Sequence, residues 1–169
     1  MKSIIVSKRG GPEVLEFSDV PEPVPGPGEV CILVEAVGCN YADVMQHFGT
    51  YPLQLELPYT PGMEAVGRVV AVGNGVDEDW IGKRVGVISF LAGAYAEKMI
   101  ASADGLIPLN DTDDAGAILA LMIQGVTAFA LLDFSGKLSP DDRVLVHAAA
   151  GGVGHLAVQI ATKLGAAHV

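Results

Sequence analysis

The feature that most constrains the fold is a turn of small residues near the C-terminal end of the chain. Residues 149–154 read Ala-Ala-Gly-Gly-Val-Gly, which is the dinucleotide-binding fingerprint with alanine in place of its first glycine. A short apolar run precedes this turn at 144–146, and apolar residues recur at helical spacing over 153–164. This order predicts a parallel strand buried on both faces, a tight turn, and a helix that stops at Gly165. Residues 167–169 look like the start of the next strand.

The glycines of this turn suit a pyrophosphate ligand. Gly151 would let the backbone approach the pyrophosphate, and Gly154 would let the helix pack closely on its strand. The first N–H groups of the helix would then face the phosphates. An ordinary tight strand-to-helix turn is the alternative. The residue that selects NAD or NADP lies about 20 residues beyond the glycines, past Val169. The predicted cofactor contacts are Ala149, Gly151, Gly152, Val153 and Gly154.

The N-terminal part of the chain has the pattern of a compact β domain. It contains several short stretches enriched in β-branched residues, and turn residues separate them. The proline-rich stretch at 21–28 must be a rigid loop that leads into the third strand. Such closely spaced strands predict a barrel or a sandwich. The predicted strands cover residues 4–6, 14–17, 31–37, 64–72 and 84–89.

The pattern changes near residue 111, where Asp111 and Thr112 offer a helix N-cap before a long apolar run. Residues 115–132 are uncharged and mostly apolar, as in a membrane span. However, acidic residues flank the run, Gln124 and Gly125 interrupt it, and neither a Lys/Arg cluster nor an aromatic belt marks an interface. We therefore predict two buried helices that meet near Gly125, and no membrane span.

Charge and cysteine content narrow the classes of partner. The formal net charge of -10 argues against nucleic acid, because phosphate binding needs a basic face. Cys31 and Cys39 are too few for a disulfide framework, and their spacing is not that of zinc ligands. Both lie in apolar stretches, so we interpret them as reduced, buried thiols of a cytoplasmic protein.

Further short motifs precede the glycine turn in an order that is typical of one superfamily. They are Pro-Gly-Pro-Gly-Glu-Val at 25–30, Gly-Cys-Asn-Tyr-Ala-Asp at 38–43, Pro-Gly-Met-Glu at 61–64, Gly-Lys-Arg-Val at 82–85 and Gly-Ala-Tyr-Ala-Glu at 93–97. Together they resemble the zinc-independent medium-chain dehydrogenase/reductases, and within them the quinone oxidoreductase (zeta-crystallin-like) branch. The resemblance covers essentially the whole chain. It implies a mixed fold, with a GroES-like β-barrel domain at 1–120 and the start of a truncated Rossmann α/β domain at 121–169.

Two departures from the zinc enzymes of this superfamily bear on the chemistry. In zinc alcohol dehydrogenases the position matching Asn40 is a cysteine ligand and the position matching Met63 is a histidine ligand. Asparagine and methionine cannot hold a catalytic zinc ion, which needs three strong donors, so we expect no metal site. His47, Asp43 and Glu64 lie nearby in the sequence. We interpret them as a surface histidine and two structural carboxylates.

Without a metal, an oxygen that gains negative charge must be stabilised by hydrogen bonds, which neutralise less charge than a Lewis acid does. An acceptor that is already electrophilic compensates for this. The resemblance therefore implies hydride transfer from NADPH to a quinone or an α,β-unsaturated carbonyl. An enoyl-thioester reductase is one alternative, although this acidic chain shows no basic patch for a bulky carrier. A non-catalytic, crystallin-like binding protein that keeps the fold is another.

The resemblance also implies roles for three side chains. Asn40 would face the nicotinamide and donate a hydrogen bond to the substrate carbonyl. Tyr51 would line the acceptor pocket as a second candidate donor, and Thr127 would contact the nicotinamide ring. Each has a structural alternative: Asn40 as a helix N-cap, Tyr51 as a half-buried loop aromatic, and Thr127 as a buried-helix hydroxyl bonded to its own backbone. No acid–base pair is evident, so no proton donor is assigned.

The length of the second segment sets a further expectation. A dinucleotide-binding sheet of the usual order has about six strands, whereas residues 142–169 have room for one strand and one helix. We therefore expect the chain as given to be an incomplete and inactive part of an enzyme. For the full-length protein we expect a cytoplasmic homodimer that acts on a small electrophilic molecule.

Overall fold

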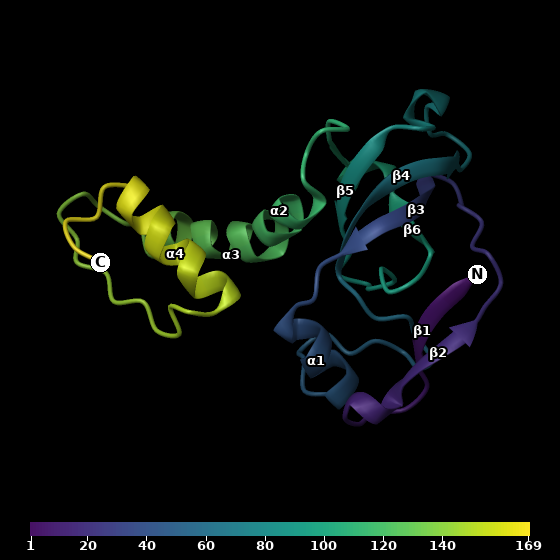
Figure 1. Ribbon diagram of the computed structural model, residues 1–169, viewed down its shortest axis with the longest axis horizontal. Helices are drawn as coiled ribbons and strands as arrows, with labels where there is room; N and C mark the ends of the chain where they lie inside the picture. The colour runs from purple at the N-terminus through teal and green to yellow at the C-terminus, as the bar shows by residue number, and fades with distance from the viewer. The chain divides into compact units, whose positions relative to one another are not determined.

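The computed structural model describes residues 1–169, which divide into two compact units, Met1–Leu119 and Ala120–Val169. All named strands belong to the first unit, and the second is mainly helical (Figure 1).

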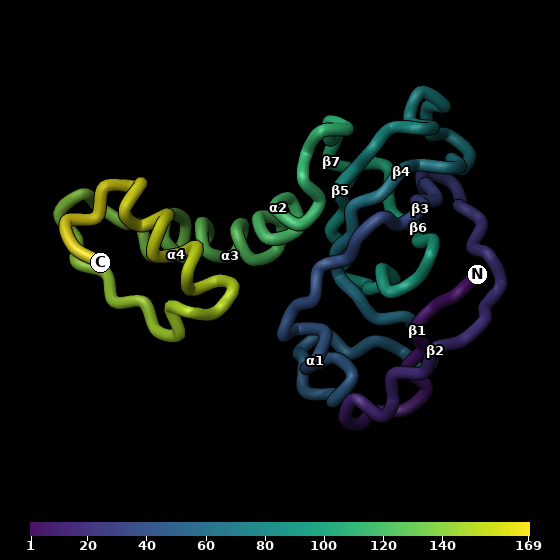
Figure 2. Tube along the Cα trace, viewed as in Figure 1, coloured from purple at the N-terminus to yellow at the C-terminus, as the bar shows by residue number.

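Two antiparallel sheets form the framework of the first unit. The smaller sheet pairs β1 (Lys2–Val6) with β2 (Leu15–Asp19). The larger sheet comprises β3 (Glu29–Val37), β4 (Glu64–Val72), β5 (Arg84–Ile88), β6 (Lys98–Ser102) and β7 (Ile107–Pro108). Its strand order is β6-β3-β4-β5-β7, with β7 beside β5 at one edge (Figure 2). The predicted β domain is therefore confirmed, with strands within two residues of their expected ends.

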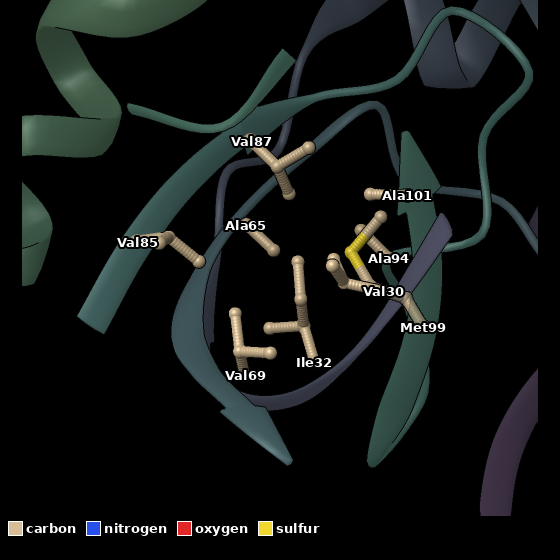
Figure 3. Packing of buried hydrophobic residues seen from close by; sticks show 9 residues of the cluster. All are labelled: Val30, Ile32, Ala65, Val69, Val85, Val87, Ala94, Met99 and Ala101. Carbon is tan, nitrogen blue, oxygen red and sulfur yellow. The ribbon is translucent and has the colours of Figure 1, made fainter. Parts of the chain in front are cut away.

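Buried side chains from several strands of the larger sheet share a common core. On β3, Val30 and Ile32 are fully buried, whereas Leu33, the residue after Ile32, is 44% exposed. Figure 3 shows the buried side chains from several strands gathered in the space that the strands enclose. Burial is nearly continuous along β5 and the first half of β4, as in strands that are covered on both faces. The cluster consists of Val30, Ile32, Ala65, Val69, Val85, Val87, Ala94, Met99 and Ala101.

An ion pair and two hydrogen bonds connect Arg84, the first residue of β5, to β3 and to the loop after β7. The Arg84 side chain is buried, and its Nε lies 2.8 Å from Oε2 of Glu35 on β3. Its Nη1 donates to the carbonyl oxygens of Asn110 at 2.9 Å and Asp113 at 2.8 Å. One buried cation thus satisfies acceptors on a strand and on the loop that leads out of the sheet.

Helix α1 (Tyr41–Phe48) follows β3 directly. Asn40 is its N-cap, with extended backbone at φ -116° and ψ 150°. The helix ends at Gly49, whose left-handed φ of 78° is a conformation that glycine adopts without steric cost. The structural alternative for Asn40, a helix N-cap, is therefore present.

The long apolar run is one helical stretch, Ala115–Ser135, and the prediction of two buried helices is wrong. It passes through α2 (Ala115–Leu119), a π-helical segment at Ala120–Gly125, α3 (Val126–Phe129) and a second π-helical segment at Ala130–Ser135. Gly125 has helical backbone angles, because a single glycine costs a helix only about 1 kcal/mol and does not break it. By length and composition alone this helix could cross a membrane, and only 22% of its apolar window is buried.

The start of this helix also differs from the prediction. Asp111 and Thr112 do not cap it, since helical structure begins at Ala115. Instead, Oδ1 of Asp114 accepts a hydrogen bond of 2.7 Å from the Ala117 N–H. The capping residue is therefore the one that immediately precedes the helix, as N-cap chemistry requires.

Around the glycine turn, the predicted helix is confirmed and the predicted strand is wrong. Helix α4 (Gly152–Lys163) follows the turn, and Gly165 with φ 92° ends it as predicted. The buried strand at 144–146 is absent: Arg143 makes a single parallel bridge with His168, and Leu145 is 81% exposed. A buried parallel strand needs neighbours on both sides, and no other segment of this chain pairs with it.

Candidate functional site

Asn40 is held at both its backbone and its side chain by carboxyl groups of the first unit. Its backbone N–H donates a 2.8 Å hydrogen bond to Oδ2 of Asp43. Its side-chain Nδ2 donates a 2.8 Å hydrogen bond to Oε1 of Glu64, the first residue of β4. All three residues are buried. Asn40 therefore combines a helix cap with a fixed side chain, rather than being a cap alone.

Tyr95 extends this network from the loop before β6. Its hydroxyl donates a 3.1 Å hydrogen bond to the same Oδ2 of Asp43 that accepts from Asn40. Burial raises the pKa of Asp43, and the hydrogen bonds from Asn40 and Tyr95 partly oppose this rise. Burial, followed by the Cys39 thiol and the Asp43 carboxyl, raises the pKa of Tyr95 far above its ordinary value. The phenol is therefore neutral at physiological pH and acts as a donor.

Gly38 makes room for the Glu64 carboxyl. A Cβ atom at Gly38 would lie 2.1 Å from Oε1 of Glu64 and 2.6 Å from its Cγ and Cδ. Such distances are far below van der Waals contact, so any side chain at position 38 would force Glu64 to move. The Gly38 N–H also donates a 3.2 Å hydrogen bond to the Glu64 carbonyl oxygen. Gly38 and Glu64 thus fit together around the Asn40 amide.

The side chains near Asn40 do not form a metal-binding set. Met63 is almost fully buried, and no three His, Cys, Asp or Glu side chains of the chain converge into a group that could hold a metal ion. The interpretation of His47 as a surface residue is wrong. It is 5% exposed, and its Nδ1 lies 2.8 Å from the carbonyl oxygen of Gly10, which comes from a segment distant in the sequence.

A hollow of about 480 Å³ in the first unit borders this network at Tyr95. Apolar residues of β1, β2 and the end of β3 line much of it. Cys39 lines it as well and is exposed, so the prediction of two buried thiols holds for Cys31 only. Asn40 and Tyr51 do not line this hollow. Tyr51 is half-buried in the loop after α1, which is the structural alternative given for it above.

In the second unit, the three glycines of the turn have different surroundings. A Cβ at Gly154 would lie 2.2 Å from the Ala148 carbonyl oxygen, and one at Gly152 would lie 2.1 Å from Oε1 of Gln124. A Cβ at Gly151 would meet a single atom, the Ala148 oxygen, at 3.3 Å. Gly154 is therefore required by packing against backbone, whereas a side chain at Gly152 would displace the end of the Gln124 side chain. Gly151, the N-cap of α4, has open space in front of it.

A hollow of about 380 Å³ lies beside this turn and is bordered by Gly151, Val153 and Gly154. The first N–H groups of α4 have no acceptor within the helix, because the first turn of any helix leaves its donors free. Ala149 and Gly152 do not line this hollow. The turn thus offers free backbone donors, which an anionic group can use. The rest of the hollow is lined mainly by apolar side chains, among them Leu131, Leu132 and Val144.

Thr127 lies in α3 of the second unit. Its hydroxyl donates a 2.6 Å hydrogen bond to the Ile123 carbonyl oxygen one turn earlier. This is the contact expected of its structural alternative, but the residue is exposed rather than buried.

Sequence reasoning identified Asn40 but missed the group around it. The structure brings Asn40, Asp43, Glu64 and Tyr95 into one hydrogen-bonded network, whereas the Tyr51 N–H donates to the Met45 carbonyl oxygen. Tyr95 falls within the motif at 93–97, yet no local signal indicates that its hydroxyl reaches a residue 52 positions earlier.

Comparisons with known proteins agree on one family. Residues 26–111 match the alcohol dehydrogenase GroES-like domain. The quinone oxidoreductase of Sus scrofa is 40% identical over 166 residues, which cover 98% of this chain and 50% of the relative. A 2-haloacrylate reductase of a Burkholderia species is 38% identical over 167 residues, with 96% and 50% coverage.

Solved structures agree with this result. The Escherichia coli quinone oxidoreductase complexed with NADPH has a TM-score of 0.91 and 35% identity, and the match covers 99% of this chain and 51% of that one. The chain therefore spans about half the length of the relatives that it matches.

Proposed function

We propose that this chain, which belongs to the alcohol dehydrogenase GroES-like family and to the quinone oxidoreductase branch of the medium-chain dehydrogenase/reductases, is part of an NADPH-dependent reductase. The whole protein transfers a hydride to a quinone or an α,β-unsaturated carbonyl, and it needs no metal. The observation that carries this proposal is Asn40, which is buried and stands at the position where zinc alcohol dehydrogenases have a cysteine ligand. Its backbone N–H is bonded to Asp43 and its side-chain amide to Glu64.

The glycine turn supports NADPH as the hydride source. NADPH supplies a hydride at its nicotinamide ring when bound, and its pyrophosphate needs several N–H donors and unobstructed space. The first N–H groups of α4 supply the donors, and Gly151 leaves the space in front of them open. We also propose that Thr127 contacts the nicotinamide, a role that its exposed position permits.

The amide of Asn40 supports the proposal that the hydride acceptor is electrophilic. An amide N–H can donate to an oxygen that gains negative charge, but it neutralises less charge than a metal ion does. A quinone or a conjugated carbonyl lowers the demand on this donor, because its negative charge is delocalised as the hydride arrives at carbon. We propose Asn40 as the principal donor to that oxygen and Tyr51 as a second donor.

The test uses the whole protein with NADPH and separate panels of quinones, conjugated ketones and enoyl thioesters. We expect NADPH oxidation with quinones or conjugated ketones, at a rate that metal chelators leave unchanged. The Asn40→Ala variant should lower kcat with little change in the Kd for NADPH. Asn74→Ala is the matched control, because that asparagine is exposed in a turn.

Three other results would contradict the proposal in different ways. A strong preference for enoyl thioesters would favour a carrier-dependent reductase. Tight NADPH binding without turnover of any acceptor would favour a non-catalytic binding protein. Activity that disappears with chelation and returns with zinc would restore the metal-dependent alternative.

A further inference from the structure

We infer that Glu64 is a positioning residue that fixes which end of the Asn40 amide is presented to the substrate. The inference concerns the orientation of Asn40, and its effect on catalysis rests on the proposed function. The contact that supports it is the 2.8 Å hydrogen bond from Nδ2 of Asn40 to Oε1 of Glu64. Asn40 is 8% exposed and Glu64 is 1% exposed, so water competes little for this bond.

The chemistry of the two groups gives the bond its direction. The two ends of an amide have similar shapes, but one end is a double donor and the other an acceptor. Oε1 of Glu64 accepts from Nδ2, and the amide oxygen has no hydrogen to donate, so this contact selects the nitrogen end of the amide. The second N–H of Asn40 and the direction of its oxygen then follow from the planar geometry of the amide.

The backbone of Asn40 is fixed independently of Glu64. Its N–H is bonded to Asp43, which also receives the Tyr95 hydroxyl. The two side-chain torsions of Asn40 then decide which atom of its amide is presented. Glu64 acts on these torsions, whereas Asp43 and Tyr95 act on the position of the whole residue.

Gly38 provides a second way to disturb the same contact. A Cβ at this position would lie 2.1 Å from the very oxygen, Oε1 of Glu64, that accepts from Asn40. The Gly38→Ala variant should therefore displace the carboxyl while leaving its charge in place. Glu64→Gln does the reverse, since it keeps the size of the side chain and lets an amide take the place of the selective acceptor.

The first test is nuclear magnetic resonance on the whole protein, with ¹⁵N label in asparagine only. The Asn40→Ala variant assigns the Asn40 side-chain signal by its disappearance. We expect one Asn40 amide proton to resonate downfield and to exchange slowly with water, as a buried hydrogen bond to a carboxylate requires. Both Glu64→Gln and Gly38→Ala should move this signal upfield. The exposed Glu16→Gln, on β2, is the matched control and should not move it. An Asn40 signal that is unchanged in both variants would overturn the inference, whether or not the protein turns over a substrate.

The second test separates positioning from a general structural role. Glu64→Gln should lower kcat by roughly tenfold to a hundredfold, the range expected for a small misplacement of a reacting group, while the Kd for NADPH changes less than about twofold. In an Asn40→Ala background the same Glu64→Gln change should have no further effect on kcat, because the group it positions is gone.

Losses that add in the double variant would overturn the inference, because Glu64 would then act without Asn40. If the wild-type protein reduces no acceptor at all, the proposed function fails. The resonance experiment alone then decides the role of Glu64, so the two failures are distinguishable.

Discussion

Replacing Gly151 with valine should separate a phosphate-binding turn from a purely structural one. Gly151 has φ -80° and ψ 170°, an extended backbone that valine adopts readily. Its Cβ would meet only the Ala148 oxygen, at 3.3 Å, so the neighbouring chain must give by a few tenths of an ångström. The change should therefore alter the free energy of unfolding by no more than about 1 kcal/mol, the usual range for N-cap substitutions.

The cost to the ligand should be much larger than the cost to the fold. The valine side chain would fill the space in front of the first N–H groups of α4, where we place the pyrophosphate. A hydrogen bond to a charged group contributes about 1.5–3 kcal/mol. Losing two such bonds costs about 3–6 kcal/mol, which corresponds to an increase in Kd of at least about a hundredfold.

Fluorescence titration of the whole protein with NADPH measures the affinity, and thermal unfolding without ligand measures the stability. Gly105→Val is the matched control, because a Cβ at Gly105 meets no atom within 4 Å. Unchanged NADPH affinity in a folded Gly151→Val protein would refute the reasoning and leave the turn with a packing role only.

Three further predictions concern the first unit and are checked by denaturant unfolding of the whole protein. Arg84→Met should lower the free energy of unfolding by about 3 kcal/mol, because it removes a buried ion pair and two bonds to carbonyl oxygens; a loss below about 1 kcal/mol would contradict this. Ile32→Ala should cost about 2–5 kcal/mol, and Leu33→Ala, at an outward position, clearly less; equal losses would mean that the core is misassigned. The raised pKa of Asp43 means that folding favours its protonated form, so its contribution to stability is fully present below its ordinary pKa of about 4 and is lost as pH rises through the raised value. Asp43→Asn should flatten that decline, and an unchanged pH profile would exclude Asp43 as its source.

Local signals in the sequence predicted the helix after the glycine turn and its end at Gly165, and they offered the cap of α1 as an alternative role for Asn40. Each depends on residues within a few positions of one another. The strand at 144–146 depends instead on neighbouring strands, and here it has only the bridge of Arg143 with His168 and the hydrogen bond from the Val144 N–H to the His168 carbonyl oxygen. The prediction that two helices meet near Gly125 was wrong because one glycine lowers the stability of a helix without deciding where the helix ends.

The chemistry of the site was predicted in part. The resemblance to a known family identified Asn40, because it stands at a recognisable position in a motif. Its partner Glu64 lies 24 residues away and was interpreted only as a structural carboxylate. The exposure of Cys39 and the burial of His47 likewise depend on segments that the fold brings together, such as Gly10 beside His47. Contacts of this range leave no pattern in the local sequence.

The most direct test of the central claim follows the hydride itself. The whole protein, stripped of metal by chelation, is incubated with NADPH that carries deuterium at the transferable position and with a conjugated ketone. Mass spectrometry and proton resonance then locate the label in the product. We predict one deuterium on carbon for each NADPH oxidised, at the same rate before and after chelation, and a large loss of rate in Asn40→Ala. Absence of label from the product, or activity that only added zinc restores, would contradict the account.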